Sequence, residues 1–358
     1  MNLLILSRYD RLGASSRLRF FQYVPILERM EINVTVSSLF SDAYVFGLQQ
    51  NKRYPFQVLS AFSRRISTLL AQRQFDLIWI EKEALPWAPA WLEQTLISSK
   101  IPYVLDYDDA VFHNYDLSNS LLVRAFLGGK HKRMIRGAAK VLVGNEYLAE
   151  YAIQAGSQEV ELIPTVIDLD RYPLSATHQF RKCESTPIVG WVGQRSTGLY
   201  LASLKQLFHR LAINNVANFV AVGLDAKSLG LPMKSIPWSE QTEVSSIAGF
   251  DIGIMPLPDD TFARGKCGYK LIQYMACSLP VIASPVGINC QIVEHGVNGF
   301  LAETAEQWEQ SLKTLLADPK LRQQMGASGR RKVESQYCLQ VTGPKLVAVL
   351  KEAAKYRT

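Results

Sequence analysis

Short apolar runs alternate with longer amphipathic stretches along this 358-residue chain. The runs have the length of single buried strands, and the stretches between them are long enough for helices. This alternation predicts an α/β protein with parallel sheets and helices on their faces. Strands are expected at 3–6, 32–36, 77–80, 103–105, 141–143, 161–163, 188–193, 219–222, 252–255, 281–283 and 299–301, and helices at 17–29, 64–72, 269–276 and 345–356.

The strand pattern stops and restarts around a mostly polar interval, which indicates two domains. The length of the chain also favours two domains over one. We therefore predict an N-terminal domain over 1–172, a linker over 173–186 and a second domain over 187–340. The remaining residues, 341–358, are expected to form a C-terminal helical segment.

Composition indicates the class of protein and its cellular environment. The chain is 48% hydrophobic and 20% charged, which is ordinary for a globular protein, and no apolar run is long enough to span a bilayer. The stretch 1–8 lacks the features of a signal peptide and is expected to be a buried strand. Five cysteines without metal-type spacing favour free thiols in a reducing cytoplasm.

The net charge of +7 is partly local, because basic residues cluster between Arg124 and Lys140 with apolar residues among them. This pattern fits a surface for anionic lipid, and it fits equally a solvated face of a domain helix. Nucleic acid is not expected as a partner, since no nucleic-acid-binding motif accompanies the charge.

The segment 264–287 is the most informative part of the chain. A loop rich in glycine and lysine leads into a short helix at 269–276, which is followed by Pro280 and an apolar strand. A helix that begins at such a loop presents free backbone N–H groups, and Lys266 and Lys270 add positive charge. The natural ligand of this arrangement is an anion, most simply a phosphate.

This segment resembles the donor-binding signature of the GT-B glycosyltransferases, in particular the retaining glycosyltransferase family 4 (glycosyl transferases group 1). Residues 274–282 match the second half of that signature, Ala-Met-Ala-x-Gly-x-Pro-Val-Ile, while Gly265 and Gln273 occupy its two Glu positions. The resemblance implies that Lys270 contacts the donor pyrophosphate and takes part in catalysis, and that Gln273 binds the nucleotide ribose. Lys266, Gly268 and Tyr269 are expected to complete the donor site.

The same resemblance implies the GT-B fold, with two doubly wound Rossmann-like domains that face each other across a cleft and a terminal helix that packs back on the first. It also implies roles for two turns. Donor-binding residues are expected at Gly13, Gly193, Gln194, Arg195, Ser196 and Thr197, and acceptor-binding residues at Ser15, Arg17 and Thr165. For the first turn, an alternative is a helix N-cap made by Ser15 or Ser16.

Three carboxylates end the strand at 103–105. Aligning this strand on the family places Asp108 at the position of the catalytic His and Asp109 directly after it. Asp108 is therefore a candidate acceptor base or transition-state stabiliser, for which a raised pKa would be suitable. Alternatives are an N-cap made by Asp109 and metal ligation, although the family generally uses no catalytic metal. Glu81 and Glu83 are interpreted as surface salt-bridge residues, with a position facing the acceptor as the alternative.

Together these features predict a retaining glycosyltransferase (EC 2.4, hexosyltransferase type) that moves a sugar from a nucleotide-diphosphate sugar to an acceptor hydroxyl. The expected acceptor is a glycan or a lipid-linked glycan of bacterial surface polysaccharide, such as lipopolysaccharide, or of glycolipid. No cofactor or metal is expected. The predicted location is the cytoplasm at the inner face of the plasma membrane. Alternatives are a non-catalytic GT-B protein, an inverting transferase and a nucleotide-sugar epimerase.

Overall fold

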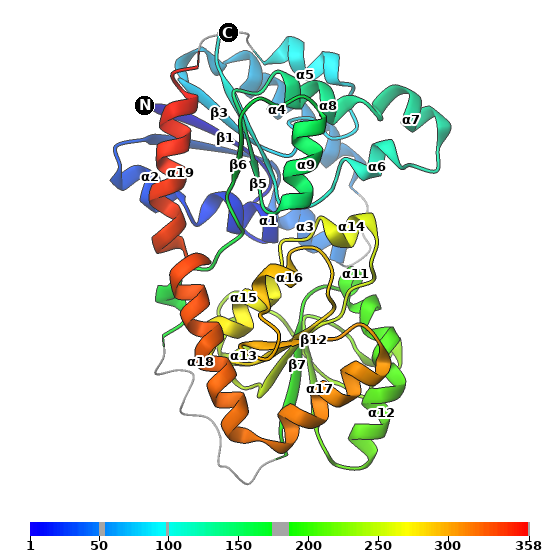
Figure 1. The fold of residues 1–358 in the computed structure, drawn as a ribbon. Coiled ribbons are helices and arrows are strands. Elements are labelled where there is room, and N and C mark those ends of the chain that lie inside the picture. Colours follow the sequence, from blue (N-terminus) through cyan, green and yellow to red (C-terminus); the bar gives the residue numbers. More distant parts are fainter. Residues whose placement is uncertain (50–53, 98–99, 174–185, 357–358) are drawn as a thin grey trace. The chain divides into compact units, whose positions relative to one another are not determined.

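The computed structural model describes residues 1–49, 54–97, 100–173 and 186–356. The chain forms two compact units, each built on a parallel sheet flanked by helices (Figure 1). The first unit comprises Met1–Thr165, Gly265–Cys267 and the chain from Thr342 onward, and the second comprises Val166–Arg264 and Gly268–Val341. Apart from its two end residues, the predicted linker lies outside the described residues.

The first sheet has the strand order β2-β1-β3-β4-β5-β6, and all neighbouring strands are parallel. Its strands are β1 (Asn2–Tyr9), β2 (Asn33–Phe40), β3 (Leu77–Glu81), β4 (Tyr103–Tyr107), β5 (Lys140–Val143) and β6 (Val160–Leu162). Its helices are α1 (Ala14–Ser16), η1 (Arg17–Phe21), α2 (Val24–Arg29), α3 (Asp42–Gln49), α4 (Pro55–Leu70), η2 (Gln72–Gln74), α5 (Ala90–Leu96), α6 (His113–Asp116), α7 (Leu121–Leu127), α8 (Lys130–Arg136) and α9 (Glu146–Gln154).

The second sheet has the order β12-β11-β10-β7-β8-β9 and is also parallel. Its strands are β7 (Ile188–Val192), β8 (Asn218–Val222), β9 (Lys234–Ile236), β10 (Ile252–Met255), β11 (Val281–Ala283) and β12 (Gly299–Leu301). Its helices are η3 (Leu169–Arg171), α11 (Arg195–Gly198), η4 (Leu199–Leu204), α12 (Lys205–Ile213), η5 (Lys227–Leu229), α13 (Glu243–Ala248), α14 (Thr261–Arg264), α15 (Tyr269–Ala276), α16 (Asn289–Ile292), α17 (Ala305–Ala317) and α18 (Pro319–Gln336).

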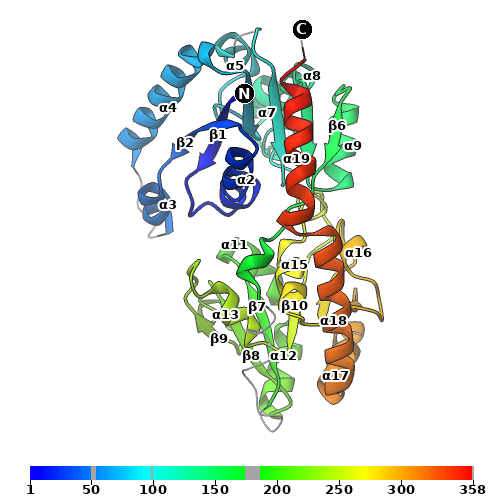
Figure 2. The same ribbon diagram turned by 90° about the vertical axis from the view of Figure 1, so that its left-hand side faces the viewer.

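The last helix, α19 (Leu339–Ala353), contacts the first unit from Thr342 onward. The hydroxyls of Tyr23 and Thr342 lie 3.0 Å apart, and Lys345 donates to the Leu162 carbonyl at 2.9 Å. The helix therefore runs between α2 and β6, as Figure 2 shows.

Each sheet is covered by its own apolar core. All five residues of β3 are buried, as are all five of β4, which is expected for central strands covered on both faces. Complete burial of one such side chain contributes roughly 1.5–3 kcal/mol. The cores therefore fix the two sheets and leave the loops at their edges to carry chemistry.

The sequence placed all the strands except β9, and the predicted α/β fold class is confirmed. The single helix expected over 17–29 is instead two helices, η1 and α2. Pro25 lies in the first turn of α2, where its missing N–H costs no helical hydrogen bond. The chain therefore restarts its helix at that point.

Candidate functional site

The strand order reverses beside β1 in the first sheet, because β2 lies on one side of it and β3 on the other. Ligands of doubly wound sheets bind outside the carboxyl ends of the strands at such a reversal. The register pairs Glu81 with Asp106, so the loops after β3 and β4 start side by side. The loop after β1 reaches the same edge, and these three loops carry the candidate site of the first unit.

Lys82 is the central residue of this edge. Its Nζ lies 2.7 Å from Asp108 Oδ1 and donates to Ser15 Oγ at 3.1 Å. The lysine directly follows β3 and has a positive φ of 63°, a conformation that non-glycine residues seldom adopt. Its side chain is 7% exposed, and that of Asp108 is 11% exposed. Lys82 thus combines a strained backbone with a buried side chain, although the sequence did not indicate it as a site residue.

The charges around Asp108 decide its protonation. Burial alone would raise the pKa of Asp108, but the Lys82 ammonium and the Ser15 hydroxyl hold it below its ordinary value. Burial likewise opposes the charge of Lys82, yet Asp108 and Glu81 raise its pKa. The raised pKa predicted for Asp108 is therefore wrong, because a cation from the neighbouring loop bonds the carboxylate. Asp108 is ionised at neutral pH.

The N-cap predicted as an alternative for the first turn is also wrong. Gly13 occupies the N-cap of α1 without a side-chain bond. Ser15 is held by Lys82, while Ser16 accepts from the Tyr9 amide at 3.0 Å and donates to Glu81 at 2.6 Å. The two hydroxyls therefore connect the first turn to the end of β3.

Glu81 and Glu83 are buried, so their interpretation as surface salt-bridge residues is wrong. Glu81 accepts from the Arg8 amide at 2.8 Å, and Glu83 pairs with Lys130 at 2.7 Å. Lys130 also lies 2.7 Å from Glu93. These carboxylates follow a buried strand, and cations from distant parts of the sequence compensate their burial.

A second buried pair supports the same edge. Arg19 Nε donates to Asp106 Oδ1 at 2.8 Å, and both side chains are 1% exposed. Arg19 also donates to the Ile163 carbonyl at 2.6 Å and to Thr165 Oγ1 at 3.5 Å. The predicted acceptor residue Thr165 is thus buried beside this pair.

Residues 265–267 join the first unit although they come from the second half of the chain. Lys266 Nζ lies 3.6 Å from Asp109, and its carbonyl accepts from Asn145 at 2.9 Å. The Cys267 thiol donates to the Asp108 carbonyl at 2.9 Å. Asp109 accepts from the Ala110 amide and does not cap α6, because the N-cap position of that helix is Phe112.

Gly265 packs against Ala110 so closely that no side chain fits. A Cβ at this position would lie 2.5 Å from Ala110 Cβ and 2.9 Å from its backbone nitrogen. The absence of the signature's first Glu is therefore accommodated by the packing of the loop.

In the second unit the strand order reverses beside β7. This unit contains the predicted donor residues except Gly13 and Lys266, which belong to the first unit. The Lys270 ammonium lies 5.2 Å from the centre of the Trp191 ring and 3.4 Å from Thr197 Oγ1. A Cβ on Gly193 would come within 2.8 Å of Lys270. The turn after β7 and the first turn of α15 thus lie together around one cation.

Gly268 precedes α15 with a φ of 64°, which glycine adopts without strain. Gln273 lies on the buried face of this helix, is 2% exposed and donates to the Tyr172 hydroxyl at 3.2 Å. The amide nitrogen that a ribose could accept from is therefore engaged by a neighbouring tyrosine.

The remaining predicted residues differ in exposure. Arg17 is buried and donates to the Arg11 carbonyl at 2.9 Å, which holds the turn between them. In contrast, Gln194, Arg195 and Ser196 are exposed at the start of α11, and Tyr269 is half-buried at the start of α15. Their ligand contacts stay predictions.

Sequence reasoning did not single out Lys82 or Arg19 in the first unit's candidate site, and it noted Asp106 only as one of three carboxylates. A charged Glu-Lys-Glu triplet directly after a wholly apolar strand was the available signal for Lys82. Within the described residues, no group of acidic residues, histidines and cysteines is arranged to hold a metal ion. No helix in the described ranges is both long and apolar enough to cross a membrane.

Comparison with known proteins supports a glycosyltransferase. Residues 179–332 match the family model described as glycosyl transferases group 1. Over 78 residues the chain is 32% identical to spore coat protein SA of Bacillus subtilis (strain 168), and this match covers 21% of each protein. The matched region therefore spans about a fifth of that relative.

Solved structures share the fold over nearly the whole chain. Sucrose-phosphate synthase from Thermosynechococcus elongatus gives a TM-score of 0.74 at 16% identity and covers 98% of each chain. HepE of Anabaena, solved with UDP and glucose, gives a TM-score of 0.69 at 17% identity, covering 98% of this chain and 99% of HepE. The predicted GT-B fold is confirmed.

Proposed function

We propose that the protein is a retaining glycosyltransferase that uses a UDP-sugar as donor. The observation that carries this proposal is the cation of Lys270 among the turn after β7, Trp191 and the first turn of α15. The positive end of a helix dipole and a nearby lysine suit a diphosphate. The match of residues 179–332 and the UDP and glucose found with HepE support this choice of donor.

In this proposal the second unit binds the donor. Lys270, the α15 amides and Arg195 neutralise the diphosphate as the bond to the sugar breaks. Gly193, Gln194, Ser196 and Thr197 form the turn that faces it. Gln273 accepts from the ribose through its amide oxygen, since its nitrogen donates to Tyr172.

The first unit binds the acceptor. Ser15, Arg17 and Thr165 shape its site, and Asp108 and Asp109 act at the reacting sugar. Because Asp108 is an ionised carboxylate, it cannot donate a proton at neutral pH; it accepts a hydrogen bond and stabilises the positive charge that develops on the sugar. The acceptor oxygen bonds the anomeric carbon on the same face from which the diphosphate leaves, so the anomeric configuration is retained. The leaving diphosphate takes the proton of the acceptor hydroxyl.

A thermal-shift panel tests the donor site. UDP and UDP-hexoses are expected to raise the melting temperature of the wild type, because a ligand of the native state stabilises it by mass action. Lys270→Ala should lose this shift, and Lys313→Ala, which alters an exposed lysine of the same unit, should keep it. The absence of any shift with nucleotide diphosphates or their sugars would count against the proposal.

Product stereochemistry tests the reaction. A retaining enzyme transfers the sugar with the anomeric configuration of the donor, which NMR of the product reads directly. The opposite anomer would indicate an inverting transferase, and a change within the donor sugar alone would indicate an epimerase.

A second candidate is a non-catalytic protein that binds a nucleotide sugar. The packing at Gly265 favours it, because the position of the signature's first acid has no room for a side chain. This protein would bind UDP-sugar without turnover, and Asp108→Asn would leave its function unchanged. A transferase should instead lose roughly a hundredfold in kcat with the same substitution.

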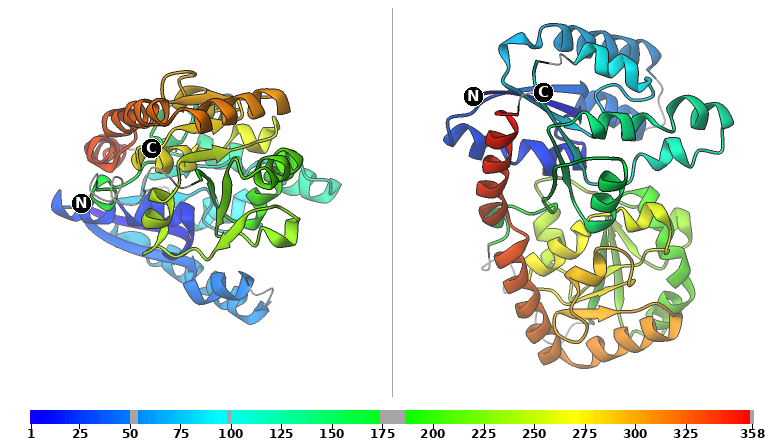
Figure 3. Two further views of the ribbon diagram at one scale, coloured as in Figure 1. Left: turned by 90° about the horizontal axis from the view of Figure 1, so that it is seen from below. Right: turned by 45° about the horizontal axis from the view of Figure 1, so that its top comes forward.

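We further propose that α7 contacts an anionic membrane on the cytoplasmic side. No residue of α7 is buried, and Leu121, Leu122 and Phe126 are each at least 70% exposed. The helix projects from its unit together with the adjoining α6 in Figure 1 and in the right-hand view of Figure 3. Such an apolar helix suits the headgroup boundary of a bilayer.

Only some of the basic residues between Arg124 and Lys140 are exposed and available to bind anionic lipid. Lys130 and Lys140 are buried in ion pairs, whereas Arg124, Lys132, Arg133 and Arg136 are exposed. Reversing the charges of Lys132, Arg133 and Arg136 should abolish sedimentation with phosphatidylglycerol vesicles, and reversal of the exposed Lys234 in the second unit should not. Equal sedimentation of both variants would remove the support for membrane contact.

A membrane location fits an acceptor that is lipid-linked. We therefore propose a role in the assembly of a bacterial surface polysaccharide or glycolipid, including lipopolysaccharide. The similarity to a spore coat protein supports only the polysaccharide part of this proposal. Radiolabelled sugar appearing in the lipid extract of membranes incubated with UDP-sugar would support this acceptor class, and label confined to water-soluble product would contradict it.

A further inference from the structure

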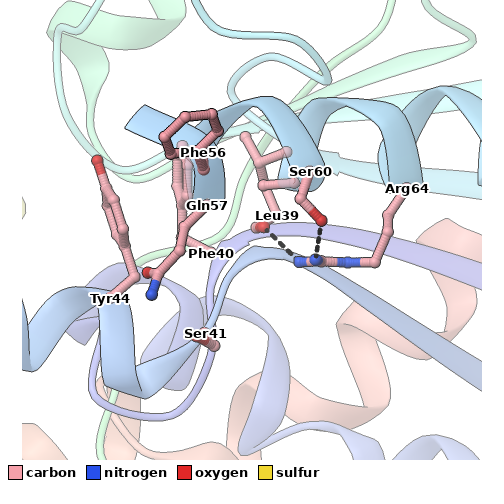
Figure 4. Close-up of a pocket in the computed structure, with 9 residues that line it drawn as sticks. Leu39, Phe40, Ser41, Tyr44, Phe56, Gln57, Ser60 and Arg64 are labelled. Atoms are coloured by element: carbon pink, nitrogen blue, oxygen red, sulfur yellow. Dashed lines mark hydrogen bonds between the residues drawn. The ribbon is translucent and has the colours of Figure 1, made fainter. Parts of the chain in front are cut away.

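A pocket of about 260 Å³ lies in the first unit, where β2 ends and α3 and α4 face each other. Figure 4 shows its walls, with Phe40 from β2, Tyr44 from α3, and Phe56, Gln57, Ser60 and Arg64 from α4. Pockets for drug-sized ligands measure roughly 300–1,000 Å³, so this one suits a single ring-sized group.

One wall is aromatic. Tyr44 stacks on Phe40 with ring centres 4.4 Å apart and an angle of 15° between the planes, which holds Tyr44 rigidly in place. Phe56 is 86% exposed in the first turn of α4. An exposed phenylalanine beside a stacked tyrosine offers two apolar surfaces to a ligand.

The other wall is polar. Arg64 donates to Ser60 Oγ at 3.3 Å and to the Leu39 carbonyl at 3.4 Å. No carboxylate among the described residues pairs with Arg64, so these two neutral acceptors orient the guanidinium without neutralising its charge. Gln57 also lines the pocket, and Figure 4 shows its amide on the side of Tyr44 rather than next to Arg64. Planar guanidinium and amide groups recognise adjacent oxygens in pairs.

The pocket shares the sheet edge of the Lys82–Asp108 pair. In the order β2-β1-β3-β4, β2 lies three strands from β4, a separation of roughly 14 Å. The loop after β1 connects the two places, because the Leu12 amide donates to Asp42 at 2.8 Å and the rings of Tyr9 and Phe40 lie 5.9 Å apart. A ligand that runs along this edge could contact both.

We propose that this pocket is a subsite for a pyranose ring of the acceptor glycan, remote from the hydroxyl that receives the new sugar. A pyranose combines an apolar C–H face with neighbouring hydroxyls at its rim, and the pocket offers aromatic surface on one side and paired donors on the other. The assignment of the pocket to the acceptor rests on the proposed function. Its ability to bind sugar does not, and the two can be tested separately.

A glycan array of microbial polysaccharide fragments tests binding directly. Wild-type protein should bind oligosaccharides on the array. Phe56→Ala and Arg64→Gln should each lower that signal at least tenfold, and both alter exposed side chains that the fold does not need. Phe46→Ala is the matched control, since Phe46 is 57% exposed on α3 but does not line the pocket. Absence of bound glycan, or binding that Phe56→Ala leaves unchanged, overturns the subsite.

Kinetics with the bound glycan then test its role. Transfer from UDP-hexose should show a kcat/KM that rises with acceptor length, and the two variants should lose about tenfold with long acceptors while keeping the activity of wild type on the shortest. An equal loss for every length overturns the remote position. Glycan binding without any turnover would instead contradict the proposed transferase and leave the sugar-binding pocket intact.

Discussion

The Lys82 ammonium lies 2.7 Å from the Asp108 carboxylate at the carboxyl end of two adjacent strands. Both groups are almost completely buried, and Lys82 adopts a left-handed backbone conformation to make the contact. The pair keeps one negative charge in place at the edge where the strand order of the first sheet reverses. This fixes what Asp108 can do: it accepts hydrogen bonds and stabilises positive charge.

Lys82→Met should destabilise the protein by about 3–5 kcal/mol at neutral pH, because it leaves a buried carboxylate without its cation. Urea denaturation measures the change, and Lys132→Met, at an exposed lysine, should have almost no effect. Since the folded-state pKa of Asp108 is depressed, its contribution is present above the ordinary pKa of about 4 and is lost as the pH falls through the folded value. The difference between wild type and Lys82→Met should therefore shrink in acid; a constant difference would contradict the pair.

His131 should make stability depend on pH. Burial lowers the pKa of His131 to about 4, with the nearby cations of Lys130 and Arg8 in the same direction and Glu83 in the opposite one. As the pH is lowered, His131 takes up a proton below about pH 6.5 in the unfolded chain but only near pH 4 in the folded protein. The free energy of unfolding should therefore decrease by up to about 3 kcal/mol as the pH falls from about 6.5 to about 4. In His131→Gln this part of the slope should be absent from urea midpoints measured between these two pH values.

Gly265→Glu, which restores the signature's first acid, should not improve donor binding. The new Cβ would meet Ala110 at 2.5 Å, and overpacking of this kind costs roughly 1–3 kcal/mol. The melting temperature should fall, and the added shift with UDP-hexose should not exceed that of the wild type. A tighter donor complex in this variant would show that the loop can open to admit the side chain.

Gly268→Ala should destabilise the second unit through the start of α15. The position has a φ of 64°, and a Cβ would lie 2.3 Å from Ile292 Cδ1. The conformation alone costs roughly 1–2 kcal/mol for most residues and less for asparagine. Gly268→Asn should therefore retain more stability than the smaller alanine variant, provided that Ile292 moves aside; Ile292→Val in the same background should recover part of the loss.

The strands could be predicted because each is a run of apolar residues between polar segments. β9 was not predicted because it is a three-residue edge strand in which Lys234 and Ser235 are exposed. The candidate residues Gly268, Lys270 and Gln273 of the second unit could be proposed from the sequence because they lie within one motif, and their ligand contacts stay predictions. The buried charges of the first unit were not, because Lys130 and Glu83, or Arg19 and Asp106, are partners across long sequence separations. Burial of either charged residue without its partner would be unfavourable, and the pattern of apolar and polar positions does not indicate which charges pair.

The membership of residues 265–267 in the first unit has a consequence for biosynthesis. Cys267 belongs to the core of the first unit, and the last helix is part of this unit from Thr342 onward. Domains generally fold in order of synthesis, the N-terminal one first. Here the N-terminal half cannot complete its core until the ribosome has delivered nearly the entire chain, so the second unit can finish folding before the first. Cutting the gene near residue 166 would accordingly yield an N-terminal fragment with an open core.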